Sequence, residues 1–307
     1  RLRRESLSAL SHGIAQMLSG VHLLLTYRCT KECDHCFVFG SPWADGTFRS
    51  EQIVRLLGQV ERLGSVETVF FEGGEPFLFY GLMLEGVRLV HEMGLRPGIV
   101  TNAYWATSPA DAELWLRPLR EAGLASLSVS DGSLYHDAGE AGLAPNAAAA
   151  CQALGMGCSV MTTDRPTVAD GQSVEGGVMF RGRASEKLIE GMPRRPWQEF
   201  TECPFEDLAD PGRVHVDACG YVHLCQGVCT GNVWQTALPE LVAGYEPASH
   251  PVCGPLLEGG PAELAARYGV QHEGEYVDAC HLCYAVRRQL MGRFPECLAP
   301  PQIYGLT

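Results

Sequence analysis

The sequence has little lysine, no excess of positive charge and no long apolar run. Lys31 and Lys187 are its two lysines among 307 residues, and the net charge is -13. Nucleic-acid-binding proteins usually carry a basic surface, so this charge balance argues against that class. No apolar run reaches the roughly 18 residues that a membrane-spanning helix needs. We therefore expect a globular protein with neither a nucleic acid nor a membrane as a partner.

The N-terminal segment, residues 1–20, is polar and amphipathic and lacks the apolar stretch of a signal peptide. It does not begin with Met, so we expect a trimmed chain. Thirteen cysteines are many for this length. In a secreted protein they would form disulfides, but the odd number and the missing signal favour metal or iron–sulfur binding in a reducing cytoplasm. Cys151 and Cys158 stand apart, and we expect both to be small buried apolar residues.

Strand-like and helix-like segments alternate over the first two thirds of the chain. Apolar runs predict strands at 21–27, 67–71, 97–101, 125–130 and 158–163, with 177–180 as a candidate sixth. Amphipathic segments between them predict helices, the first with Ser50 as its N-cap. Such alternation is typical of βαβ units with a parallel sheet, either open and doubly wound or a partial barrel. In both, the chemistry lies at the C-terminal ends of the strands.

Three cysteines follow the first predicted strand, in the stretch TYRCTKECDHCFVFG. Cys29, Cys33 and Cys36 have the spacing C-x3-C-x2-C. A structural zinc site is closed by four ligands, and an iron–sulfur cube usually takes four thiolates. Three thiolates in one short loop leave one coordination position open for a substrate or cofactor. The alternative is a zinc loop that a distant fourth ligand completes.

This spacing resembles the C-x3-C-x-aromatic-C loop of the radical S-adenosylmethionine (radical SAM) superfamily, which follows the first strand of a partial (β/α)6 barrel. His35 occupies the aromatic position, where Tyr or Phe is usual. An imidazole ring can also stack on adenine, which makes this a mild departure. The resemblance implies a [4Fe–4S] cluster on Cys29, Cys33 and Cys36 whose open iron binds S-adenosylmethionine (SAM).

A second motif supports the resemblance. Gly73, Gly74, Glu75 and Pro76 directly follow the second predicted strand, and glycines let a ligand approach the backbone closely. In the superfamily this motif holds the amino group of SAM, although alone it is also an ordinary βα turn. The resemblance further implies SAM contacts at Asn102 after the third strand, Ser128 and Ser130 in the fourth, and Arg181 and Arg183 near the sixth.

The last third of the chain has a different organisation and eight of the thirteen cysteines. Residues 213–226 predict a β-hairpin that turns at 218–220. The region resembles the twitch form of the SPASM extension, which implies one auxiliary [4Fe–4S] cluster on Cys203, Cys225, Cys280 and Cys283. Two clusters or a zinc ion are the alternatives. The spare cysteines are Cys219, the main rival of Cys203, and Cys229, Cys253 and Cys297.

The resulting fold prediction is an α/β protein, a partial (β/α)6 radical SAM barrel followed by a small cysteine-rich α+β domain. The predicted divisions are an amphipathic lead-in at 1–20, the barrel at 21–197 and the auxiliary-cluster domain at 198–307. Many peptide maturases begin with a peptide-binding domain. Residues 1–20 are too few for one, so we expect any such domain to be a separate protein.

The resemblance implies reductive cleavage of SAM to a 5′-deoxyadenosyl radical that abstracts a hydrogen atom from a substrate. We favour oxidation or other modification of a small molecule, as in 2-deoxy-scyllo-inosamine dehydrogenase, helped by the auxiliary cluster. The alternatives are maturation of a ribosomally made peptide, formylglycine formation in a protein, and a non-enzymatic iron–sulfur scaffold or electron carrier. The expected electron donor is a flavodoxin or ferredoxin, docked at a basic spot formed by Arg28, Lys31 and Lys187.

Candidates for catalytic residues follow from position alone. Glu72, Asp131 and His136 lie at or after the ends of predicted strands and are candidates for a general base. If the reaction is an epimerisation, a cysteine that binds no metal, such as Cys229 or Cys297, is the expected hydrogen donor.

Aromatic side chains follow the third and fourth predicted strands. Tyr104, Trp105 and Tyr135, together with His136, are candidates for substrate contact at the mouth of the barrel. Packing beneath loops is an equally good explanation of aromatic residues at such places.

Overall fold

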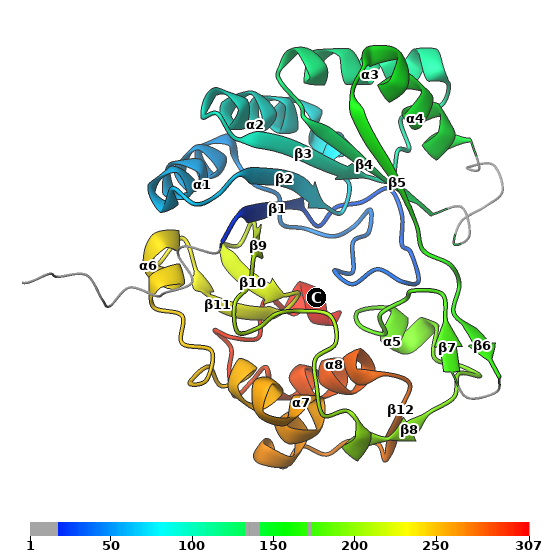
Figure 1. Ribbon diagram of the computed structural model, residues 1–307, viewed down its shortest axis with the longest axis vertical. Helices are drawn as coiled ribbons and strands as arrows, with labels where there is room; N and C mark the ends of the chain where they lie inside the picture. Colours follow the sequence, from blue (N-terminus) through cyan, green and yellow to red (C-terminus); the bar gives the residue numbers. More distant parts are fainter. Residues whose placement is uncertain (1–17, 133–134, 136–141, 171–172, 307) are drawn as a thin grey trace, which may run out of the picture.

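A computed structural model of the chain describes residues 18–132, 135, 142–170 and 173–306 (Figure 1). One eight-stranded sheet organises the fold, in the order β11-β10-β9-β1-β2-β3-β4-β5. The strands from β9 to β5 in this order are parallel to one another, and β10 and β11 are antiparallel additions. Their bounds are Gly20–Thr26 (β1), Thr68–Gly73 (β2), Arg96–Thr101 (β3), Ser126–Asp131 (β4), Gly157–Thr162 (β5), Arg213–Asp217 (β9), Tyr221–Cys225 (β10) and Val228–Asn232 (β11).

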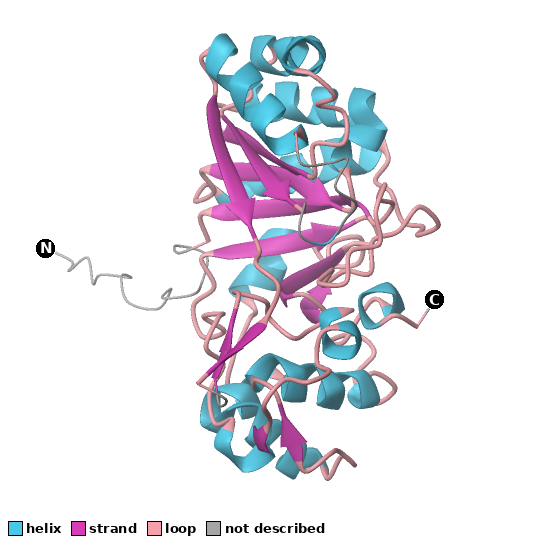
Figure 2. Cartoon of the chain, turned by 90° about the vertical axis from the view of Figure 1, so that its right-hand side faces the viewer, coloured by secondary structure: helices cyan, strands magenta, loops and turns pink. Residues whose placement is uncertain are grey.

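Helices join the consecutive parallel strands and cover one face of the sheet (Figures 1 and 2). They are α1 (Ser50–Leu63), α2 (Tyr80–Glu92), α3 (Pro109–Glu121) and α4 (Leu143–Leu154). The prediction that Ser50 is the N-cap of α1 is wrong, because the helix begins at Ser50 and Arg49 is the N-cap. The side chain of Gln52 accepts a hydrogen bond from the Arg49 backbone N–H (2.8 Å), which satisfies that end of the helix.

The fold class predicted from the sequence is confirmed. All five strands expected between residues 21 and 163 are present, and the hairpin expected at 213–226 is the pair β9–β10. β1 is buried along nearly its whole length, as a central strand of a parallel sheet should be. The parallel sheet with its helices is consistent with a partial radical SAM barrel, and the cysteine-rich region follows it.

The strand predicted at 177–180 is not formed. Gly176 and Gly177 have φ values of 119° and 73°, which break an extended backbone. After β5 the chain forms a small hairpin of β6 (Thr167–Ala169) and β7 (Ser173–Glu175), then a loop that leads to α5 (Ala184–Lys187). The sixth parallel strand is β9, from the last third of the chain, and it joins the sheet beside β1.

β5 forms one edge of the sheet, and all six of its residues are exposed. Cys158 is therefore exposed, so the prediction that it is buried is wrong. Cys151 in α4 is fully buried, as predicted. Val160 and Met161 remain 46% and 44% exposed, which leaves an apolar strip on this edge.

The last third of the chain continues the same sheet and then adds helices (Figure 1). Its helices are α6 (Leu238–Ala243), α7 (Cys253–Tyr268), which bends at Gly259 and Gly260, and α8 (Ala279–Leu290). Short elements complete the fold: β8 (Arg195–Pro196) paired with β12 (Glu275–Tyr276), and 3-10 turns at Pro76–Phe79, Trp197–Glu199 and Pro301–Tyr304. Because β9 pairs with β1, the sheet is continuous across the boundary predicted at 197–198, and that boundary stays a prediction.

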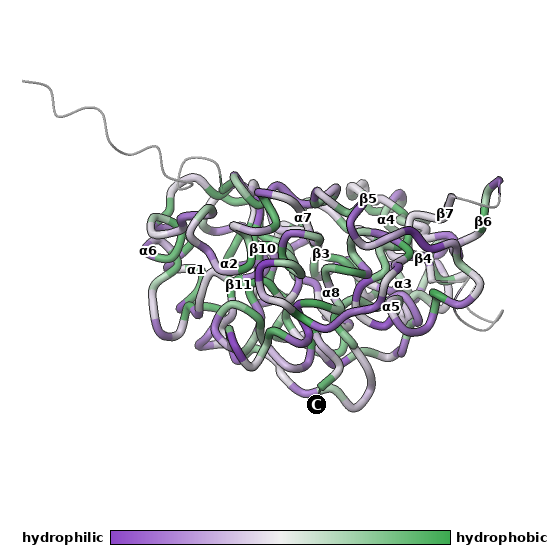
Figure 3. The backbone as a smooth tube through the Cα atoms, turned by 90° about the horizontal axis from the view of Figure 1, so that it is seen from below, coloured by the Kyte–Doolittle hydropathy of each residue, from purple (hydrophilic) through white to green (hydrophobic). Residues whose placement is uncertain are grey.

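Apolar side chains from the sheet and its helices form one large core, with a smaller cluster around Phe180 and Leu188. Figure 3 shows apolar segments such as β3 among the interior parts of the chain. Within the ranges that the structure describes, no helix combines the length and the apolar character needed to span a bilayer.

Candidate active site and metal centres

The three cysteines of the first motif lie around one cavity at the C-terminal ends of β1, β2 and β3. Cys29 follows β1, and the loop turns so that Cys36 N donates to Cys33 O (3.1 Å). The cavity has a volume of about 150 Å³. Burial raises the pKa of Cys29 to about 11 and that of Cys33 to about 12, so both thiols keep their protons at neutral pH until a metal binds.

This cavity fits a group held by three thiolates. No fourth cysteine is among the described residues that line it. Asn102 Nδ2 lies 3.5 Å from Cys29 Sγ, and the Gly40 backbone N–H donates to Cys36 Sγ (3.3 Å). N–H donors aimed at sulfur stabilise the anionic thiolates that an iron–sulfur cluster requires.

The glycines of the second motif let the end of β2 pass close to the end of β1. A Cβ atom on Gly74 would lie 2.1 Å from Arg28 O, and one on Gly73 would lie 2.4 Å from Thr26 O. Gly74 N donates to Thr26 O (2.6 Å), and Glu75 N donates to Arg28 O (2.8 Å). The motif therefore fixes the start of the cysteine loop, while its contact with the amino group of SAM stays a prediction.

The side chain of Glu75 is buried at the end of β3. Its carboxylate accepts hydrogen bonds from Phe77 N (3.0 Å), Thr101 Oγ1 (2.8 Å) and Asn102 N (2.7 Å). Burial raises the pKa of Glu75 to about 7 against the opposing effect of these bonds. Glu75 thus positions Asn102 beside the cysteines, and the buried Pro76 begins the following 3-10 turn.

The predicted aromatic contacts divide into two groups. His35 lines the cavity, and its ring centroid lies 4.2 Å from that of Tyr135. Trp105 is buried and stacks on Phe77 at 4.3 Å, so its predicted contact with substrate is wrong. Tyr104 is half-buried and is not among the described residues that line the cavity.

Of the two serines predicted on β4 as SAM contacts, one lines the cavity and the other does not. Ser130 lines the cavity, but Ser128 Oγ lies 3.1 Å from Ser159 Oγ on β5 and is not among the described lining residues. Asp131 is the last residue of β4. His136 lies outside the described residues.

Arg183 holds the cysteine loop. Its guanidinium donates to Cys33 O (3.2 Å) and Gly40 O (2.7 Å), and its backbone N–H donates to Cys36 O (3.0 Å). Gly182 precedes it with a φ of 59°, and a Cβ there would lie 2.5 Å from Cys36 O. The structure gives Arg183 this structural role in place of the predicted contact with the SAM carboxylate.

Four cysteines of the last third meet in a second pocket. The pocket is lined by Cys203, by Cys225 at the end of β10, and by Cys280 and Cys283 near the start of α8. They are the four cysteines that the sequence predicts as auxiliary ligands. Burial raises the pKa of each of Cys203, Cys280 and Cys283, that of Cys283 to about 12.

Two buried arginines face these thiols. Arg181 Nη1 lies 3.0 Å from Cys225 Sγ, and Arg287 Nη1 lies 4.0 Å from the same sulfur. Their side chains line the pocket, and in the described part of the chain neither Nε atom has a hydrogen-bond partner. Buried cations without enough acceptors are costly, so these residues fit an anionic group held by four thiolates, either a cluster or zinc.

The position of Arg181 differs from what the family resemblance implies. Arg181 lies at the second pocket, so its predicted contact with the SAM carboxylate is wrong. Arg287, which also donates to Gln226 O (3.0 Å), is not among the residues predicted from the sequence. The sequence spacing could have indicated it, because Arg287 follows Cys283 by four residues on the same helix and so lies on the same helix face.

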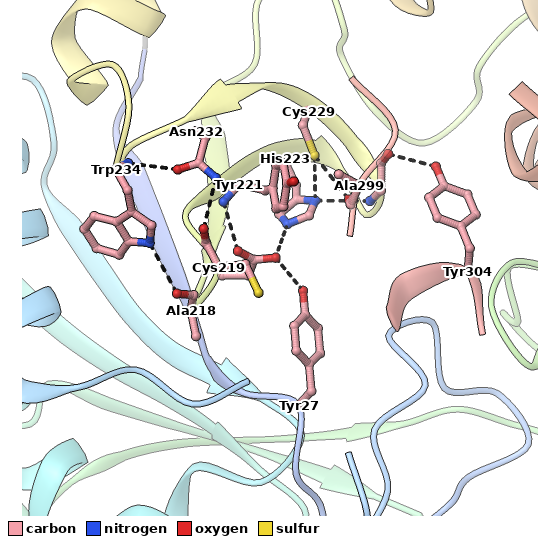
Figure 4. Close-up of polar contacts among 12 residues, drawn as sticks. Tyr27, Ala218, Cys219, Tyr221, His223, Cys229, Asn232, Trp234, Ala299 and Tyr304 are labelled. Atoms are coloured by element: carbon pink, nitrogen blue, oxygen red, sulfur yellow. Dashed lines mark hydrogen bonds and ion pairs between the residues drawn. The ribbon is translucent and has the colours of Figure 1, made fainter. Parts of the chain in front are cut away.

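The spare cysteines do not line the second pocket among its described residues. Cys219 is exposed, which removes it as the rival of Cys203. Cys229 is buried in a different polar network, with its sulfur 3.3 Å from His223 Nδ1 (Figure 4). His223 Nε2 lies 3.3 Å from Asp217 Oδ2, which accepts a hydrogen bond from the Tyr27 hydroxyl (2.8 Å). Cys253 and Cys297 also lie outside the described lining of the second pocket.

A third polar group lies inside the sheet, where Glu72 on β2 faces two histidines. His215 Nε2 on β9 lies 2.9 Å from Glu72 Oε1, and His22 Nδ1 on β1 lies 3.3 Å from Glu72 Oε2. Burial would raise the pKa of Glu72, but the two imidazoles hold it well below its usual value. Glu72 lines the first cavity, and such a weakly basic carboxylate is a poor candidate for the predicted general base.

Comparisons with known proteins agree with this site. Residues 23–130 match the radical SAM superfamily. YydG of Bacillus subtilis (strain 168), whose name links it to peptide biosynthesis, is 24% identical over 110 residues, which are 36% of this chain and 34% of that protein. The match thus spans about a third of that relative's length.

A solved structure shares the architecture. A crystal structure of BtrN in complex with AdoMet and 2-DOIA superposes with a TM-score of 0.50 and 16% identity, over 75% of this chain and 83% of that chain. Streptococcus suis SuiB bound to S-adenosylmethionine gives a TM-score of 0.39 and 12% identity, over 74% and 65%. The chain therefore carries a radical SAM domain match at residues 23–130, and BtrN shares its fold.

Proposed function

We propose that the chain is an enzyme whose Cys29, Cys33 and Cys36 hold a [4Fe–4S] cluster that binds SAM. When bound, this group supplies the 5′-deoxyadenosyl radical that takes a hydrogen atom from a substrate. The observation that carries the proposal is the cavity with three cysteines and no fourth among its described lining residues.

The surrounding residues position this group and limit side reactions. Arg183 and the two glycines of the second motif hold the loop backbone. Asn102, fixed by Glu75, points its amide at the sulfur of Cys29. His35 and Ser130 form part of the cavity wall and are the proposed contacts for the adenosyl part of SAM.

We further propose that Cys203, Cys225, Cys280 and Cys283 hold one auxiliary [4Fe–4S] cluster. Arg181 and Arg287 supply buried positive charge beside these sulfurs, which favours an anionic cluster. A second cluster in the same chain gives an electron from an oxidised substrate somewhere to go. This favours oxidation of a small molecule, with a flavodoxin or ferredoxin reducing the first cluster.

The second candidate function is maturation of a ribosomally made peptide. One observation favours it, the sequence match of this chain to YydG, a protein whose name links it to peptide biosynthesis. Formation of 5′-deoxyadenosine in the presence of aminocyclitols, sugars or synthetic peptides separates the two. Stimulation by peptides alone would overturn the small-molecule proposal.

The iron content of anaerobically reconstituted protein tests the two clusters. We expect about eight irons per chain in the wild type and about four, with [4Fe–4S] spectra, after Cys29, Cys33 and Cys36 are all changed to Ala. The matched variant with Cys203, Cys280 and Cys283 changed to Ala should also keep about four and should still cleave SAM. A first variant without iron would show that the second pocket holds zinc or no metal. SAM cleavage by that variant would overturn the assignment of the first site.

A further inference from the structure

We propose that His22, Glu72 and His215 bind one divalent transition-metal ion inside the barrel, apart from both cysteine sites. One ligand atom from each side chain lies within 4.8 Å of the other two. The three residues come from β1, β2 and β9, which are adjacent strands. The backbone of the sheet therefore fixes their spacing.

The strand register places the donors on one face. His22 and His215 are direct partners across the β1–β9 ladder. Glu72 lies two residues beyond Phe70, the β2 partner of His22, and so shares its face. The ring of Phe70 stacks on that of His22 with centroids 4.8 Å apart, which restrains the imidazole. The donors are thus held in place without a metal, as a preformed site requires.

The hydrogen bonding of this group is incomplete. In the described part of the chain, His22 Nδ1 and His215 Nδ1 are buried and have no hydrogen-bond partner. A buried polar atom without a partner is destabilising. His22 Nδ1 lies 3.3 Å from Glu72 Oε2, a spacing that two ligands of one ion can have. A bound metal ion would accept His22 Nδ1 as a ligand.

Two imidazoles and one carboxylate form a ligand set for zinc, iron(II) or manganese with open coordination positions. Two of the three residues also line cavities. Glu72 lines the cavity of the first cysteine loop, and His22 lines a second cavity of about 370 Å³ that includes Arg213 and Glu206. The open positions suit water or an oxygen or nitrogen atom of the substrate. This last role, but not metal binding, rests on the proposed function.

Manganese(II) titration followed by electron paramagnetic resonance tests the site in cluster-loaded protein. Oxidised [4Fe–4S] clusters give no signal, and manganese prefers oxygen and nitrogen ligands to thiolates. We expect loss of the free-ion signal for one Mn2+ per chain. His215→Ala and the isosteric Glu72→Gln should each weaken binding about tenfold or more.

The control variant is His91→Ala, which changes an exposed histidine on α2 and should bind as the wild type does. Iron content and cluster absorbance verify that each variant is folded. No binding by the wild type, or equal binding by wild type and Glu72→Gln, would overturn the proposal. Neither result would affect the proposed function, because SAM cleavage and iron content are measured separately.

Discussion

The guanidinium of Arg181 lies 3.0 Å from the sulfur of Cys225, and two residues later Arg183 holds the backbone at Cys33. One short segment between β7 and α5 therefore contacts both cysteine sites. Its residues at this point are Phe180, Arg181, Gly182 and Arg183. The two proposed clusters are thus joined by a direct protein path of a few residues.

Replacing Arg181 by Gln should make the auxiliary cluster harder to reduce. A hydrogen bond from a charged donor contributes about 1.5–3 kcal/mol, which corresponds to a potential lower by about 60–130 mV for one electron. A redox titration followed by electron paramagnetic resonance measures this. Arg288→Gln is the control, because Arg288 lies on the same helix as Cys283 but pairs with the exposed Glu186. An unchanged potential in Arg181→Gln would contradict the proposal.

Replacing Arg183 by Ala should loosen the first cysteine loop. The variant loses hydrogen bonds to Cys33 O and Gly40 O from a largely buried guanidinium. We expect a loss of about 2–3 kcal/mol of stability and fewer irons at the first site, with the auxiliary site still loaded. Arg62→Ala serves as control, since Arg62 also donates to a carbonyl, that of Gly58, but on the surface. Retention of iron at the first site would show that the loop does not need Arg183.

Changing Gly74 to Ala should disrupt the junction of β1 and β2. The new Cβ would meet backbone atoms of Arg28 and Tyr27 at less than 3 Å, and those atoms cannot move freely. We expect a loss of about 3 kcal/mol or more. Gly58→Ala in α1 meets no atom within 4 Å and should stabilise the helix by about 1 kcal/mol. Thermal denaturation of both variants measures the two changes in stability. Equal changes would contradict the prediction that Gly74 is required at the junction.

The sequence predicts local features well where the chemistry is local. The alternating strands and helices and the hairpin before Cys225 follow from nearby residues. The group formed by His22, Glu72 and His215 could not be predicted, because His215 lies far along the chain from the other two and meets them only when β9 pairs with β1.

The contacts of Arg181 and Arg183 could not be predicted from the sequence for the same reason. The family resemblance implied contacts with SAM for both, near a sixth strand at 177–180, but that strand is not formed, and Gly176 and Gly177 have positive φ values there. The segment therefore turns toward Cys36 and Asp278 instead, through hydrogen bonds from Arg183 N and Phe180 N. The course of this segment in the folded chain therefore decides that Arg181 reaches the second cysteine pocket and Arg183 the first cysteine loop.

Reversing the charge of Arg28 and Lys31 should slow reduction by a flavodoxin. Both residues flank Cys29 on a chain of net charge -13, and Arg28 is exposed and paired with Asp45 at 3.2 Å. Electrostatic steering predicts a rate about tenfold lower at low ionic strength and a smaller effect in high salt. Stopped-flow absorbance of the cluster measures the rate. Arg117→Glu on α3 is the control, and an equal decrease in both variants would contradict docking at Arg28 and Lys31.

The stability of the protein without SAM should depend on pH through Glu75. Burial raises its pKa from 4.5 to about 7. Between these values the folded carboxyl keeps a proton that the unfolded chain has lost, so stability falls as the pH rises through this window, by up to about 1.4 kcal/mol per pH unit.

Glu75→Gln removes the titrating group and keeps one oxygen, which can accept from Phe77 N and the Thr101 hydroxyl, while the Asn102 amide, bonded to the other oxygen, loses its acceptor. The difference in denaturation midpoint between wild type and Glu75→Gln, measured anaerobically from pH 4.5 to 7.5, isolates this contribution because the other groups are common to both. We expect the wild type to lose stability relative to the variant as the pH rises. A difference that stays constant would show that the three hydrogen bonds of Glu75 hold it ionised throughout, and that it positions Asn102 as a carboxylate.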